Sequence, residues 1–234
     1  MQRSMQRFDF EAMMREAEAR AARGVRLCRC GAEIAIAKRL CLACEERERR
    51  EAREKARERA IADVERSIPP VLAWARFDAP ELRQRVDPVR AIELAKTALN
   101  AQSVVLVGDS GSGKSSLAVA MLRELASRGE RGLFVDSRAL VRARMAHRMG
   151  EGEADLVDRA MRARVLVLDE LGAEIGKGTA ESVVAEVIHE RHAWQRPTIY
   201  TTPFTASELT ARYGAGIVRR IVEGADLIRL RGAS

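Results

Sequence analysis

Short apolar runs alternate with longer amphipathic stretches over most of this chain. The runs have almost no polar positions, which is typical of strands buried on both faces, and the stretches between them have helical periodicity. Strands are expected at 103–107, 132–136, 165–168, 198–202 and 226–230. Helices are expected at 88–100, from 115 onward, and at 137–149, 154–163, 179–194 and 214–223. This alternation predicts an α/β fold in which helices cover both faces of a parallel sheet.

The amino-terminal segment has a different pattern. A helix is expected at 6–23, where Phe10, Met13 and Met14 recur at helical spacing and Gly24 provides a stop. This helix either packs on its own domain or docks a partner, and the sequence leaves both alternatives open.

A dense charged run follows at 45–66. Its eight acidic and eight basic residues cancel, and several form favourable pairs four positions apart. The run has no sustained apolar heptad, so a solvated helical linker is expected instead of a coiled coil. Pro69 and Pro70 mark a break. We therefore expect an amino-terminal module at 1–44, a linker at 45–67 and the main domain at 68–234.

Composition adds three limits. Hydrophobic residues make up 47% of the chain, enough for a globular core. No apolar run approaches the roughly 18 residues of a membrane helix, and no signal-peptide apolar region is present, so a cytoplasmic protein without membrane contact is expected. The net charge of +7 permits nucleic-acid binding.

Residues 108–115 read Gly-Asp-Ser-Gly-Ser-Gly-Lys-Ser, directly after the expected strand 103–107. This phosphate-loop pattern aims backbone N–H groups and the positive end of the next helix at a di- or triphosphate. Lys114 would reach the β- and γ-phosphates, and the Ser115 hydroxyl would ligate Mg²⁺. The residues expected to contact the nucleotide are Gly108, Asp109, Ser110, Gly111, Ser112, Gly113, Lys114, Ser115, Ser116 and Asp169.

Two carboxylates, Asp169 and Glu170, follow the apolar run 165–168. Ligands of a parallel sheet gather at the carboxyl ends of its strands, so both side chains are expected beside the phosphate loop. Asp169 would help Ser115 to hold Mg²⁺, and Glu170 would orient the attacking water. The pair favours nucleotide hydrolysis over simple binding.

All four cysteines lie within a short segment, as Cys28, Cys30, Cys41 and Cys44. Two close pairs separated by a loop are typical of a structural Zn²⁺ site with four thiolate ligands. The first pair has C-x-C spacing in place of the usual C-x-x-C, and free or redox-active thiols are the alternative.

At 165–174 the sequence Val-Leu-Val-Leu-Asp-Glu-Leu-Gly-Ala-Glu resembles the AAA+ ATPases of the DnaC/IstB group. This group contains replicative-helicase loaders and ATP-binding helpers of insertion-sequence transposases. Further similar segments occur in order at 68–70, 189–191, 196–202, 213–221 and 228–232. The resemblance implies a P-loop AAA+ core that binds ATP and Mg²⁺. We expect it without a C-terminal lid, and hence with slow intrinsic turnover.

The resemblance also implies roles for individual residues. Thr202 would end the strand that senses the γ-phosphate, although Pro203 stands where the family usually has asparagine. Either Thr201 or Thr202 would then sense the γ-phosphate, or the sensing would be weak. Arg220 matches the arginine finger that reaches a neighbouring subunit's γ-phosphate, with Arg219 as the fallback, so self-oligomerisation is implied.

An arginine-rich helix is the expected contact with single-stranded DNA, because in the resembling loaders this region faces the central channel of the oligomer. Its arginines would follow the phosphate backbone. They are Arg138, Arg142, Arg144 and Arg148, with Arg159, Arg162 and Arg164 as a possible extension. A solvated basic helix is the alternative.

Three functions remain open. The first is a helicase loader whose zinc-bearing amino-terminal module docks the hexameric replicative helicase. The second is a transposition helper that binds duplex DNA and a transposase. The third is an ATP-switched adaptor that hardly hydrolyses ATP.

Overall fold

The computed structural model describes residues 10–147, 154–174 and 178–231. Two compact units divide the chain, one at Met1–Lys55 and one at Ala56–Ser234. None of the described helices is both long enough and apolar enough to cross a membrane.

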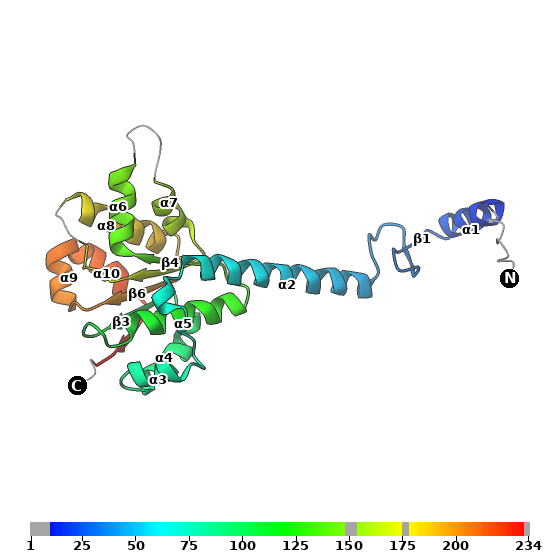
Figure 1. The fold of residues 1–234 in the computed structure, drawn as a ribbon. Coiled ribbons are helices and arrows are strands. Elements are labelled where there is room, and N and C mark those ends of the chain that lie inside the picture. Colours follow the sequence, from blue (N-terminus) through cyan, green and yellow to red (C-terminus); the bar gives the residue numbers. More distant parts are fainter. Residues whose placement is uncertain (1–9, 148–153, 175–177, 232–234) are drawn as a thin grey trace. The chain divides into compact units, whose positions relative to one another are not determined.

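A five-stranded parallel sheet forms the centre of the second unit (Figure 1). Its spatial order is β4-β5-β6-β3-β7. The strands are β3 (Ser103–Val107), β4 (Gly132–Asp136), β5 (Val165–Asp169), β6 (Thr198–Thr202) and β7 (Ala225–Arg229). All five strands lie where the apolar runs predicted them, within one residue at the ends, which confirms the α/β expectation.

Two apolar clusters cover the two faces of this sheet. On β5, Val165 and Val167 belong to one cluster, while Leu166 and Leu168 belong to the other. Successive side chains of a strand point to opposite faces, so the uninterrupted apolar run is needed to fill both clusters.

Helices lie on both sides of the sheet (Figure 1). The first cluster includes residues of α3 (Pro80–Arg85), α4 (Arg90–Thr97) and α5 (Lys114–Ser127), with the short 3₁₀ turns Pro70–Leu72 and Ala98–Asn100 nearby. The second cluster includes residues of α6 (Ser137–Ala146), α7 (Asp155–Arg162), α8 (Thr179–Ala193), α9 (Ala206–Tyr213) and α10 (Ala215–Val222).

Helix α9 was not predicted from the sequence, although its start carries a recognisable signal. The Thr205 hydroxyl accepts the N–H of Glu208, and the Glu208 carboxylate accepts the N–H of Thr205. This reciprocal capping box can be read from Thr-x-x-Glu before the apolar Leu209. A two-turn helix has too few apolar positions to show its period clearly.

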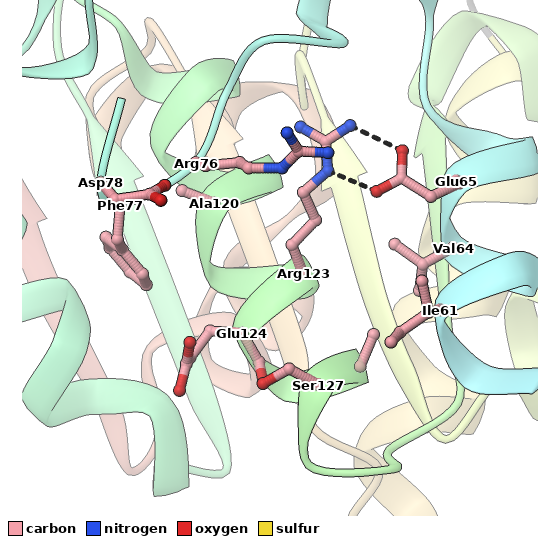
Figure 2. A pocket seen from close by; sticks show the side chains of 11 residues that line it. Ile61, Val64, Glu65, Arg76, Phe77, Asp78, Ala120, Arg123, Glu124 and Ser127 are labelled. Atoms are coloured by element: carbon pink, nitrogen blue, oxygen red, sulfur yellow. Dashed lines mark hydrogen bonds and ion pairs between the residues drawn. The ribbon is translucent and has the colours of Figure 1, made fainter. Parts of the chain in front are cut away.

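The expectation of a solvated linker is wrong for the second half of α2 (Leu42–Ser67). Ala60 and Val64 are fully buried and belong to the first apolar cluster. The Arg123 guanidinium of α5 donates two hydrogen bonds of 2.7 Å to Glu65, beside a cavity of about 460 Å³ (Figure 2). The apolar positions Ala60, Val64 and Ile68 recur only every four residues among many charged ones, so the sequence pattern did not reveal them.

The first unit contains α1 (Phe10–Ala22), a hairpin of β1 (Val25–Leu27) and β2 (Glu33–Ala35), and the start of α2. The helix expected at 6–23 is present from Phe10, and residues 6–9 lie outside the described part. None of the residues of α1 is buried, and Phe10 and Met13 are exposed. Helix α1 contacts β1 of the same unit and also presents exposed apolar side chains, so packing on its own domain and docking of a partner both remain predictions.

Candidate nucleotide-binding site

The loop at 108–115 joins β3 to α5 and has the backbone shape that its glycines predict. Gly113 caps α5 with a φ of +85°, in the left-handed region that glycine adopts without strain. A Cβ on Gly113 would lie 3.0 Å from the Arg85 carbonyl oxygen, and one on Gly108 would lie 2.2 Å from the Leu230 carbonyl oxygen. Both glycines thus let neighbouring backbone pack against the loop.

Lys114 is nearly buried beneath this loop. Its ammonium donates to the carbonyl oxygens of Gly108 and Asp109, at 2.7 and 2.5 Å. Burial lowers the pKa of Lys114, while the nearby carboxylates of Asp169, Asp109 and Glu170 oppose that shift. A cation held this way inside a phosphate loop is placed to meet phosphate oxygens.

Asp169 ends β5 at the same edge of the sheet, with a side chain that is 6% exposed. The Thr201 hydroxyl donates to Asp169 Oδ1 at 2.6 Å. Burial raises the pKa of Asp169, while hydrogen bonds from Thr201 and Ser115 lower it. Ser115 and Asp169, the two residues expected to hold Mg²⁺, thus lie close together. A divalent cation would compensate the buried charge of this carboxylate.

Glu170 is held at both ends of its backbone, in a left-handed conformation with a φ of +55°. Its N–H donates to the Thr201 hydroxyl at 2.9 Å, and its carbonyl accepts from Ser137 Oγ at 2.9 Å. A left-handed non-glycine residue costs on the order of 1–2 kcal/mol, which these contacts help to offset. Its carboxylate forms an ion pair with Arg138.

A cavity of about 330 Å³ opens over the loop. Its lining includes Lys114, Ser115, Glu170 and two residues that sequence reasoning did not assign to the lining, Arg85 and Pro203. Arg85 ends α3, and its guanidinium lies over the Trp74 ring at 4.9 Å from the ring centroid. No local sequence signal placed Arg85 here, because α3 reaches the loop only through tertiary packing.

Comparison with known proteins identifies the family. The family described as IstB-like ATP binding protein matches residues 5–234. The chain belongs to the IstB-like ATP-binding family. It is 26% identical over 130 residues to the replicative helicase loader DnaC of Escherichia coli K12. That match covers 55% of this chain and 53% of DnaC, so the chain spans about half the length of the curated relatives it matches.

Solved structures agree with this assignment. The crystal structure of the DnaC helicase loader gives a TM-score of 0.57 at 25% identity and covers 69% of this chain and 99% of that chain. The crystal structure of DnaI has a TM-score of 0.58 at 25% identity and covers 71% of this chain and 93% of that chain. AMPPCP-bound DnaA from Aquifex aeolicus, at 22% identity, has a TM-score of 0.51 over 59% of this chain and 44% of that chain. These neighbours confirm the AAA+ fold.

The two candidate sensor threonines of this IstB-like chain have different surroundings. The Thr202 hydroxyl donates to the Leu171 carbonyl at 2.7 Å and accepts the Phe204 N–H at 3.1 Å. Those contacts fix the turn after β6. The Thr201 hydroxyl, in contrast, bridges Asp169 and the backbone of Glu170.

The candidate finger residues lie on α10. The Arg220 guanidinium donates to the Gly216 carbonyl one turn earlier, at 2.8 Å, and the side chain is half-buried. Arg219 is exposed. The assignment of Arg220 as the arginine finger, with Arg219 as the fallback, stays a prediction.

The arginines of α6 are not a uniform basic face. Arg138 pairs with Asp136 and Glu170, and Arg144 pairs with Glu186 of α8. Arg142 is exposed, and Arg148 lies outside the described residues. The sequence around α6 has no acid from 138 to 148, but the partner acids come from a preceding strand, the β5 end and α8. The suggested extension is also paired, through Arg159 with Asp155, Arg162 with Asp158 and Arg164 with Glu130.

The four cysteines converge as predicted. Their Sγ atoms all lie within 4.8 Å of one another. A tetrahedral zinc site with Zn–S bonds of about 2.3 Å needs S–S edges of about 3.8 Å, so the cluster fits the ion. The Cys41 N–H lowers the pKa of Cys28 to about 6, so this thiol readily supplies a thiolate ligand.

Proposed function

We propose that this chain is an ATP-hydrolysing loader of a replicative DNA helicase. The observation that carries the ATPase part is that Lys114, Ser115 and Glu170 line the cavity over the phosphate loop. Asp169 lies beside Ser115 at the same edge of the sheet. The similarity to loaders named DnaC and DnaI supports the helicase part.

Each residue has a defined task in the proposed hydrolysis. The loop N–H groups and Lys114 bind the phosphates, and Ser115 with Asp169 would hold Mg²⁺. When bound, Mg²⁺ would neutralise part of the negative charge of the phosphates. Glu170 orients the attacking water once its carboxylate leaves Arg138. Thr201 takes the sensing role in preference to Thr202, because only the Thr201 hydroxyl contacts Asp169.

Completion of the site by a second subunit is part of the proposal. Arg220 would stabilise the transition-state charge of a neighbour's ATP, so that hydrolysis depends on assembly. Arg142, exposed on α6, is the described residue best placed to contact single-stranded DNA. Such contacts give an affinity that falls with salt.

The first unit is proposed to bind one structural zinc and to dock the helicase. Four thiolates leave no open position for substrate, so the ion would stabilise the fold. Phe10, Met13 and Met14 are exposed on α1 and provide apolar surface for a partner. Exposed apolar residues on one short helix are typical of helix-in-groove docking.

A transposition helper is the second candidate, because the matched family is described as IstB-like over residues 5–234, the cysteine module included. Binding assays with the full-length protein separate the two. A loader is expected to bind the hexameric helicase and single-stranded DNA, whereas a helper is expected to bind duplex DNA and a transposase.

The nucleotide site itself is tested by Lys114→Ala. We expect at least a hundredfold loss of ATP affinity or turnover, about 3 kcal/mol, because the loop loses its central cation. Lys96→Ala is the matched control, since Lys96 is an exposed lysine of the same unit that pairs with Glu93. Equal ATPase activity in Lys114→Ala and the wild type would reject the nucleotide site.

A further inference from the structure

Glu174 is a fully buried carboxylate on the loop after β5. Oε2 accepts the Gly172 N–H at 3.1 Å and Ser137 Oγ at 3.0 Å. Oε1 accepts Arg212 Nε at 3.2 Å and the Tyr213 hydroxyl. An ionised carboxylate has about four lone-pair sites and no donor, so it can accept from all four groups. The single hydrogen of the Ser137 hydroxyl is shared between Glu174 Oε2 and the Glu170 carbonyl.

One side of this network leads to the nucleotide cavity. Ser137 Oγ, which contacts Glu174, also lies 2.9 Å from the Glu170 carbonyl. Ser137, at the start of α6, therefore connects the two ends of the loop from Glu170 to Glu174. Because Glu170 has a left-handed backbone, its position depends on contacts of this kind.

The other side leads to the helix that carries Arg220. Arg212 and Tyr213 form the end of α9, and Gly214 turns the chain into α10. Arg212 also donates to the Glu174 backbone carbonyl. Both the side chain and the backbone of Glu174 thus hold the α9–α10 corner against the loop that bears Glu170.

We propose that Glu174 is a positioning residue for ATP hydrolysis, which ties the loop carrying Glu170 to the α9–α10 corner carrying Arg220. This inference rests on the proposed ATPase function. Glu174 touches neither phosphate nor water. It fixes the position of Glu170, which acts on the ATP of its own subunit, relative to Arg220, which acts on the ATP of the neighbouring subunit.

Two variants test the proposal. Glu174→Gln keeps the shape of the side chain but points an NH₂ donor at groups that are themselves donors. Tyr213→Phe removes the hydroxyl donor and keeps the aromatic ring. We expect kcat to fall about tenfold or more for Glu174→Gln and about threefold for Tyr213→Phe, because small misplacements at a reacting centre cost up to ~100-fold in rate. ATP affinity should stay within about twofold, since the phosphate loop is unchanged.

Glu208→Gln is the matched control. It weakens the capping box at the other end of α9, so it destabilises the same helix without touching the Glu170 loop. Circular dichroism and thermal unfolding report folding for all three variants. A folded Glu174→Gln or Tyr213→Phe protein with wild-type kcat, or an equal loss of kcat in Glu208→Gln, would overturn the positioning role.

Hydrogen–deuterium exchange separates this inference from the proposed function. If Glu174 ties the two segments, Tyr213→Phe should speed exchange at 170–174 and at 212–220 together, whether or not ATP is hydrolysed. Unchanged exchange in both segments would show that Glu174 does not connect them. Absence of hydrolysis by the wild type would instead reject the proposed ATPase function, and the exchange result would still decide the tie.

Discussion

The two compact units of this chain are stabilised in different ways. In the unit from Ala56 onward, two large apolar clusters cover both faces of a sheet. In the unit that ends at Lys55, the buried cluster among the described residues consists of Cys28, Ile34, Leu40 and Cys44, and half of its members are thiols. This contrast predicts that hydrophobic burial is sufficient for the larger unit and insufficient for the smaller one.

The two kinds of core can therefore support different kinds of site. A large core can hold strained or buried polar groups such as Glu170, Asp169 and Lys114 in place, which a nucleotide site requires. In a unit below about 70 residues a single hydrophobic core rarely supplies enough stability, and a metal or disulfides are often needed. We therefore expect the cysteine unit to depend on a bound metal ion and the nucleotide-binding unit to depend on packing.

Zinc removal should have the largest effect and should be confined to the cysteine unit. Structural zinc contributes ~10–16 kcal/mol in small metal-dependent folds. A strong chelator, or Cys44→Ser, should unfold residues 25–44, as seen by proteolysis and by hydrogen exchange. The thermal transition of the other unit should not move. If residues 25–44 of a zinc-free protein remained protected from proteolysis and hydrogen exchange, the proposed metal dependence of this unit would be wrong.

Arg191→Met should give the largest loss in the nucleotide-binding unit. Arg191 is 1% exposed, and its guanidinium donates to the carbonyls of Ala160, Ala163 and Pro197. Methionine would fill the space but remove the Arg191 donor from the buried carbonyls of Ala160 and Ala163, at a cost of roughly 3–5 kcal/mol, while the Pro197 carbonyl keeps the N–H of Leu166. Urea unfolding measures the loss. Arg219→Met, at an exposed site, should change stability by less than about 0.5 kcal/mol, and equal effects would contradict the structure.

Arg138→Ala should change activity with little change in stability. Its ion pair competes for the Glu170 carboxylate, so its removal should raise DNA-free kcat about three- to tenfold, equivalent to about 1 kcal/mol. Arg142→Ala, on the same helix, should leave kcat unchanged. A fall in kcat for Arg138→Ala would show that Arg138 assists hydrolysis.

The smallest expected effect concerns Glu65→Gln, where α2 meets α5. The Arg123 side chain lowers the pKa of Glu65, so the pair stabilises the fold above the unfolded pKa of about 4.3 and loses that contribution as the pH falls further. Glu65 is partly exposed, so solvent screening limits the effect to about 1 kcal/mol at pH 7. Wild type and variant should unfold alike near pH 3, and a difference that persists there would exclude the charge mechanism.

The sequence predicted those features that depend on local pattern. Buried strands, the phosphate loop and the cysteine cluster all follow from runs or spacings along the chain. Features formed by residues distant in sequence were missed, such as Arg85 beside the loop and the pairing of Arg138 and Arg144 with acids of other elements. The buried half of α2 was missed for a related reason, because its four-residue apolar spacing is weak among many charges.

The central claim is that ATP is handled by one unit and the helicase is bound by the other. The most direct test is copurification of full-length variants with the hexameric replicative helicase of the source organism, together with ATP binding on the same samples. Lys114→Ala should keep the helicase and lose ATP, whereas Cys44→Ser should keep ATP and lose the helicase. Helicase binding that survives in Cys44→Ser, or loss of the helicase in Lys114→Ala at saturating helicase, would contradict this division.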